Sequence, residues 1–127
     1  MEAVVLAGIA RRVLDELLKN PYRTIELRGA RNVLAVERAL EEASRLFLTY
    51  DPFEDVSVGT EGLLTELIEA RELEMRIPWE ESDEREMTVC RARIKLLGLG
   101  RVTDVEREGD VILVRVRELL PHEMGMG

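Results

Sequence analysis

The stretch TIELRGARNVLAVERALEEASRLF, residues 24–47, changes its hydrophobic period in the middle and predicts a strand followed by a helix. Ile25 and Leu27 alternate with polar residues, as in a strand with one buried face. From about Asn32 onward the apolar residues recur at helical spacing. They are Val33, Val36, Leu40, Ala43 and Phe47. Gly29 lies between the two patterns and predicts a tight turn from the strand into the helix.

On the N-terminal side of this stretch, residues 4–18 place apolar side chains near helical spacing and predict an amphipathic helix. The pair Asn20-Pro21 ends that helix, because proline disfavours the helical conformation in the residue before it.

On the C-terminal side, Asp51-Pro52 interrupts the chain, and short strands are predicted over residues 56–59 and 73–77. The segment between them, residues 60–72, leaves two alternatives open. Its leucines suit a helix of one or two turns with Thr60 as the N-cap, and they equally suit a long hairpin.

Residues 79–86 read as a charged connection, and a new alternation follows it. Cys90, Ala92, Ile94 and Leu96 alternate with basic residues, which favours a strand over a helix because a helix would scatter these apolar side chains around its axis. Gly98 and Gly100 predict a turn. A hairpin of residues 102–107 and 111–117 is then predicted around Gly109-Asp110.

The composition predicts a cytoplasmic protein with one small core. The chain has 127 residues, 46% of them hydrophobic, and no apolar run of the roughly 18 to 20 residues that a membrane span needs. Its first ten residues lack the basic start of a signal peptide. Basic residues are mostly Arg, Gln is absent and Asn occurs twice, a bias typical of proteins from thermophiles.

Neither catalysis nor a cofactor is expected from this sequence. The single cysteine, Cys90, excludes an internal disulfide and a cysteine-based metal site, and it is expected to be a small buried apolar residue. The single histidine, His122, lies in a tail that is expected to be loose. No nucleophile, base or set of metal ligands can be placed together, so we predict neither an enzyme nor a metal protein.

The turn after the first predicted strand is one candidate binding region. It comprises Arg28, Gly29, Ala30, Arg31 and Asn32. Glycine permits close backbone approach, and a helix N-terminus attracts an anion. The alternative is an ordinary turn, in which Asn32 caps the helix and the arginines pair with nearby glutamates.

A second candidate is the strand face formed by Arg91, Arg93 and Lys95. Residues 87–103 contain four basic residues and no acidic one, although the whole chain has a net charge of −8. Such a face can hold RNA backbone, but no aromatic residue lies among its members, so no base-stacking platform is expected. The alternative is a sheet surface neutralised by ion pairs.

The order of elements and four short motifs resemble the Alba family of small archaeal chromatin and RNA-binding proteins. The motifs are Arg28-Gly29, Ala35-Val36-Glu37, Phe47 and Val58-Gly59-Thr60. The resemblance implies an α/β fold, a two-layer sandwich with helices on a small mixed sheet, over residues 1–79. Residues 80–127 would form a C-terminal antiparallel β extension packed on that core as one domain. It also implies an archaeal source and a homodimer.

Two departures from the family pattern bear on function. Leu6, Ala7, Gly8 and Ile9 stand where the family has a basic pair. The segment that corresponds to the family's basic arm carries four glutamates against Arg71.

We therefore predict a non-catalytic, nucleic-acid-associated binding protein, with RNA favoured over duplex DNA. Its predicted contact residues are Arg28, Gly29, Arg31, Asn32, Arg91, Arg93 and Lys95. The alternative is an acidic protein–protein interaction or assembly module that retains the fold without binding nucleic acid. No membrane partner is expected.

Overall fold

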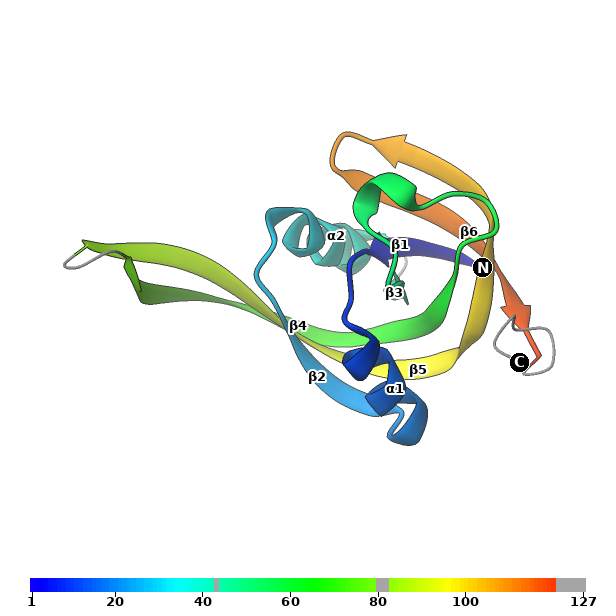
Figure 1. Ribbon diagram of the computed structural model, residues 1–127, viewed down its shortest axis with the longest axis horizontal. Helices are drawn as coiled ribbons and strands as arrows, with labels where there is room; N and C mark the ends of the chain where they lie inside the picture. Colours follow the sequence, from blue (N-terminus) through cyan, green and yellow to red (C-terminus); the bar gives the residue numbers. More distant parts are fainter. Residues whose placement is uncertain (43, 80–82, 121–127) are drawn as a thin grey trace.

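The computed structural model describes residues 1–42, 44–79 and 83–120, with the backbone alone for residues 73–79 and 83–88. Within these ranges the chain forms an α/β fold (Figure 1). Its elements in chain order are β1 (Glu2–Leu6), α1 (Arg11–Lys19), β2 (Tyr22–Leu27), α2 (Ala30–Glu41), β3 (Arg45–Leu48), the 3-10 helix η1 (Phe53–Asp55), β4 (Glu61–Trp79), β5 (Asp83–Glu108) and β6 (Val111–Leu119). No helix in the described part has the length and apolar character to cross a membrane.

The strands form one mixed sheet that closes on itself. Its order is β2-β5-β4-β3-β1-β6, and β6 also pairs with β5, so that five strands form a ring to which β2 is attached. The β1–β3 pair is parallel and the other pairs are antiparallel. Because β5 pairs with β2, β4 and β6, the C-terminal strands complete the ring instead of extending a finished sheet.

Strands β4 and β5 continue beyond the ring as a two-stranded arm (Figure 1). From Arg71↔Arg91 to Trp79↔Asp83 they pair with each other, whereas β3 leaves β4 at Glu66 and β2 leaves β5 at Cys90. Residues 61–72 therefore lie in β4, a strand of a long hairpin, which confirms the hairpin alternative and not the helix. The charged connection is shorter than predicted, since β5 already begins at Asp83.

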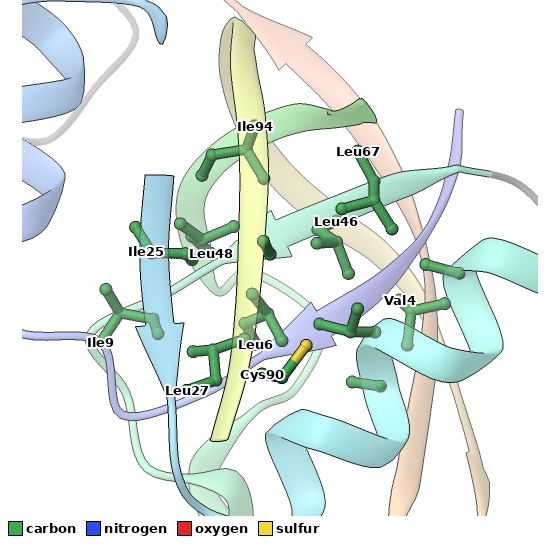
Figure 2. Packing of buried hydrophobic residues seen from close by; sticks show 14 of the residues in the cluster. Val4, Leu6, Ile9, Ile25, Leu27, Leu46, Leu48, Leu67, Cys90 and Ile94 are labelled. Atoms are coloured by element: carbon green, nitrogen blue, oxygen red, sulfur yellow. The ribbon is translucent and has the colours of Figure 1, made fainter. Parts of the chain in front are cut away.

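The core consists of two hydrophobic clusters on opposite faces of the strands. Val4 and Leu6 of β1 belong to the first cluster, together with Leu17 of α1 and Val36 of α2. Figure 2 shows part of this cluster, including Cys90, which is buried as predicted. The second cluster has members from the five ring strands and Val56, among them Phe47. One cluster is thus covered by the helices and the other is enclosed by the ring.

The helix predicted over residues 4–18 is wrong at its start. Val4 and Leu6 lie in β1, which pairs with β3, and the helix begins only at Arg11. Gly8 separates the two elements with a φ of 65°, a conformation that glycine adopts without strain. A first strand is therefore present where only a helix was predicted.

The second helix ends earlier than predicted. It stops at Glu41, Ser44 has a positive φ of 53°, and Phe47 lies fully buried in β3. The strand predicted over residues 56–59 is also wrong. There the chain makes a turn at Gly59, with a φ of 98°, and the Ser57 amide donates to the Thr60 hydroxyl at 3.0 Å.

Gly98 and Gly100 do not form the predicted turn, because β5 continues through both residues without interruption. A Cβ atom at Gly100 would lie 2.3 Å from Cγ1 of Val116, so the glycine permits β6 to pack closely. The predicted strand over residues 90–96 is confirmed, and so is the hairpin at Gly109, whose φ is 57°. The predicted loose tail with His122 lies outside the described residues.

Candidate nucleic-acid interface

One face of the β2–β5–β4 part of the sheet gathers three of the seven predicted contact residues. Residues directly opposite each other in antiparallel strands have side chains on the same face. The register therefore places three cross-strand rows side by side, which we call the cationic face. The rows are Tyr22, Lys95 and Glu66; Thr24, Arg93 and Glu69; and Glu26, Arg91 and Arg71.

Glu26 links two of the predicted arginines. Its carboxylate accepts a hydrogen bond from Nε of Arg91 at 2.9 Å, and it lies 3.7 Å from a guanidinium nitrogen of Arg28. Arg28, which follows β2 directly, thus joins the cationic face at its edge. The arginine side chains remain 50% and 59% exposed, so this shared carboxylate neutralises them only in part.

The other cations of the face have more freedom. Within the described residues, no carboxylate lies at ion-pair distance from Arg71, Arg93 or Lys95. Nζ of Lys95 lies 5.7 Å from the ring centroid of Tyr22, which is 49% exposed. Such a contact is a weak cation–π interaction at an exposed position. The face therefore combines unpaired cations with an accessible aromatic ring.

Sequence reasoning missed Tyr22 and Arg71. Both lie at least 20 residues from Arg91 along the chain and reach it only through strand pairing. The alternation of Tyr22, Thr24 and Glu26 with buried Ile25 and Leu27 was a signal that Tyr22 is on a polar face. It carried no information about which strand would lie beside it.

The structure directs Arg31 away from the cationic face. Its guanidinium bonds Oε1 of Glu54 at 2.8 Å, lies 3.7 Å from Asp110 and stacks over the Phe53 ring at 4.3 Å. The hydrogen bond from Arg31 lowers the pKa of the Glu54 carboxyl. Arg31 thus joins the start of α2 to the segment around η1.

Asn32 and Gly29 have roles different from those predicted. Asn32 lies in the first turn of α2, and its amide forms hydrogen bonds to both the N–H and the C=O of Ala7. Gly29 is the N-cap, with a φ of −71° that any residue adopts. A Cβ there would meet nothing within 4 Å. The turn is thus held by side-chain contacts instead of by a glycine-specific conformation.

Two carboxyl groups meet where α2 approaches the base of the arm. A hydrogen bond to Glu72 raises the pKa of Glu37, with burial and the charges of Glu72 and Glu41 acting in the same direction. Burial raises the pKa of the Cys90 thiol, and the charges of Glu72 and Glu37 raise it further. These conditions favour an inert thiol. No cluster of three metal-ligating side chains occurs among the described residues.

An open cavity of about 340 Å³ lies between α1 and the start of β4. Leu14 and Leu18 line one wall, and the Arg11 guanidinium stacks over Tyr50 at 4.5 Å. Glu61, one of the acidic residues that line the cavity, forms an ion pair with Arg101 at 2.6 Å.

A structure comparison supports the fold. The N-terminal domain of the Lon protease from the Mycobacterium avium complex is similar, with a TM-score of 0.58 and 13% sequence identity. The match covers 98% of this chain and 57% of that one, so the chain spans little more than half the length of this neighbour. At this identity the likeness shows the fold alone.

The sequence comparisons assign a family. No curated protein matches the chain. A family model described as "Protein of unknown function (DUF473)" matches residues 1–116. The chain belongs to this family.

Proposed function

We propose that the protein binds single-stranded RNA, without catalysis, through the cationic face. The observation that carries this proposal is the convergence of Arg71, Arg93 and Lys95 beside the exposed ring of Tyr22. Cations without carboxylate partners are available to phosphates, and an accessible aromatic ring is available to an unstacked base. Arg28 and Arg91 enlarge the face at the side of Glu26.

The geometry favours a single strand over a duplex. The face is a sheet surface carrying three carboxylates, Glu26, Glu66 and Glu69, between its cations. These carboxylates oppose the broad phosphate contact that a duplex makes, because each one repels a nearby phosphate. A flexible strand can place its phosphates at the cations and one base on Tyr22. Net charge opposes distant attraction, so binding has to depend on these local contacts.

The proposal keeps the Alba resemblance as its context. The succession of β2, Arg28-Gly29 and α2 supports the resemblance. With the resemblance we also propose a homodimer, an archaeal source and a two-layer arrangement over residues 1–79. The ring closure by β5 and β6 has no counterpart in that pattern. Arg31 and Asn32 are left outside the proposed contact set, because Glu54 and Ala7 already engage them.

Fluorescence anisotropy with labelled single-stranded RNA, duplex RNA and duplex DNA over a salt series tests the proposal. Arg93→Ala and Arg71→Ala should each weaken single-strand binding and reduce the salt slope by about 0.7. Arg31→Ala is the matched control, since it removes the same charge elsewhere. Tyr22→Ala should cost about 1–3 kcal/mol if a base stacks there, whereas Tyr22→Phe should not.

Two results would reject this function. One is the absence of salt-dependent binding at about 50 mM salt, where attraction to phosphate is strong. The other is an equal loss of affinity in the Arg31 control, because that result would indicate a general charge effect.

A second candidate function, an acidic protein-interaction or assembly module, is favoured by a different observation. The β4–β5 arm projects from the ring, and residues 72–86 carry seven carboxylates against two arginines. A projecting element of this charge suits contact with a basic protein surface.

A further inference from the structure

The cavity between α1 and the start of β4 has an apolar lining that two elements supply. Leu63 and Leu99 are opposite each other in the β4–β5 register, so their side chains share one face. Leu14 and Leu18 are one helical turn apart on α1, and all four leucines line the cavity. Leu18 is 46% exposed and Tyr50, which also lines the cavity, is 52% exposed. The cavity thus presents apolar side chains to solvent.

Carboxylates outnumber cations around this apolar lining. Asp15, Asp51 and Glu61 line the cavity together with a single cation, Arg11. Glu61 is already in an ion pair, and the Arg11 guanidinium lies over the Tyr50 ring. Asp15 and Asp51 have no basic partner among the side chains that the structure describes. Two carboxylates beside the apolar surface are therefore available to a positively charged group.

Hydrogen bonds from a buried threonine fix the acidic end of the cavity. The hydroxyl of Thr49, a residue that is 1% exposed, donates to the Glu61 carbonyl at 3.2 Å and accepts from the Asp51 amide at 3.2 Å. The Asp51 carbonyl accepts a further hydrogen bond from the Gly8 amide at 2.8 Å. The backbone that carries Asp51 and Glu61 is thus held in place, which lowers the cost of ordering it when a ligand binds.

The size and the lining of the cavity suit a small molecule. Its volume of about 340 Å³ lies in the range of about 300–1,000 Å³ found for small-molecule sites, which are mostly apolar with a few polar groups. A stable protein contact needs about 800 Å² on each partner, which a hollow of this size does not supply by itself.

We propose that this cavity binds a small organic amine with an apolar body. Its ammonium group lies at Asp15 and Asp51, and its apolar part contacts Leu14, Leu18 and Tyr50. Opposite charge selects an amine over a neutral or acidic molecule of the same shape. The site shares no residue with the cationic face, so this inference does not rest on the proposed RNA binding.

Three probes built on one indole-ethyl frame test the proposal. Tryptamine, tryptophol and indole-3-propanoate carry an ammonium, a hydroxyl and a carboxylate group on that frame. Titrations followed by methyl NMR at neutral pH should shift the signals of Leu14 and Leu18. Tryptamine should bind about three- to tenfold more tightly than tryptophol, because each of the two carboxylates contributes as an exposed ion pair does. Indole-3-propanoate should bind most weakly.

Two double variants separate the cavity from a general charge effect. Asp15→Asn with Asp51→Asn should remove the preference for tryptamine and leave the affinity for tryptophol unchanged, a result that a merely structural disturbance would not give. Asp104→Asn with Asp110→Asn makes the same charge change at exposed positions outside the cavity, and it should retain the preference. If the first variant does not fold, Leu18→Lys should weaken tryptamine binding more than tryptophol binding, and an unchanged preference would overturn the proposal.

Three other results would also overturn it. One is equal affinity for the three probes or tighter binding of the acid. Another is a preference for tryptamine that survives in the variant with Asp15→Asn and Asp51→Asn. The third is the absence of saturable shifts up to about 5 mM tryptamine, a weak limit for a ligand of about a dozen non-hydrogen atoms.

Discussion

The side chain of Asn32 bonds both backbone groups of Ala7. The Ala7 amide donates to Oδ1 at 3.2 Å, and Nδ2 donates to the Ala7 carbonyl at 3.1 Å. These bonds join the first turn of α2 to the residue after β1, 25 positions away along the chain. Asn32 thus makes the two hydrogen bonds that a neighbouring strand would otherwise make, at a point where the backbone leaves the sheet.

Replacing Asn32 by Ala should destabilise the fold by about 1–3 kcal/mol. Both backbone groups of Ala7 lose their partner in a part-buried position, and leaving such groups unpaired costs more than the hydrogen bonds themselves contribute. Urea denaturation measures the loss. Asn32→Asp should lose less, because it keeps an acceptor for the Ala7 amide and adds a negative charge near a helix N-terminus. Equal stability of Ala and wild type would show that water replaces these bonds.

Gly100→Ala should be strongly destabilising, and shortening Val116 should rescue it. The new Cβ would lie 2.3 Å from Cγ1 of Val116, so either the side chain or the strand must move, typically at about 1–3 kcal/mol. In the double variant Gly100→Ala, Val116→Ala that contact disappears, although the lost valine methyls leave their own cost.

Gly62→Ala provides the contrast. Its Cβ would lie 2.3 Å from the backbone oxygen of Leu48, which no side-chain substitution can remove. Thermal unfolding of Gly100→Ala, Val116→Ala and their double variant should therefore show that the double variant loses less stability than the sum of the two single losses. Strictly additive losses would mean that β5 and β6 separate instead of clashing.

Local patterns predicted those elements whose period continues long enough to be unambiguous. The turn from β2 into α2 and the hairpin at Gly109 are examples. The five residues of β1 are too few to distinguish strand from helix by periodicity, and their pairing with β3 is a tertiary fact. Phe47 continued the helical stripe by coincidence of spacing. Gly100 resembled a turn because the sequence does not show the close approach of Val116.

The candidate interface divides in the same way. Period-two alternation within one strand placed Arg91, Arg93 and Lys95 on a common face. The addition of Tyr22 and Arg71 required the register between strands, which depends on long-range contacts. The partners of Arg31 and Asn32, namely Glu54 and Ala7, were equally out of reach for local reasoning.

The Glu37–Glu72 pair should make stability fall as the pH rises above the acidic range. The pKa of Glu37 is raised from its ordinary value of 4.5, chiefly by the hydrogen bond to Glu72. A carboxyl whose pKa is raised by folding stabilises the folded state below its unfolded pKa, and this stabilisation is lost as the pH passes its folded pKa. Glu37→Gln should therefore be more stable than wild type at pH 7, by less than about 1 kcal/mol at this exposed position.

Near pH 3.5 that advantage should disappear, because the Glu37 carboxyl, whose pKa is raised, is then protonated. Glu54→Gln should show the opposite sign. The pKa of Glu54 is lowered by Arg31, so its contribution is present at neutral pH and lost on acidification. Melting temperatures between pH 3.5 and pH 7.5 would distinguish the two variants. A Glu37→Gln variant that is less stable than wild type at pH 7 would indicate that the pair is held by another cation.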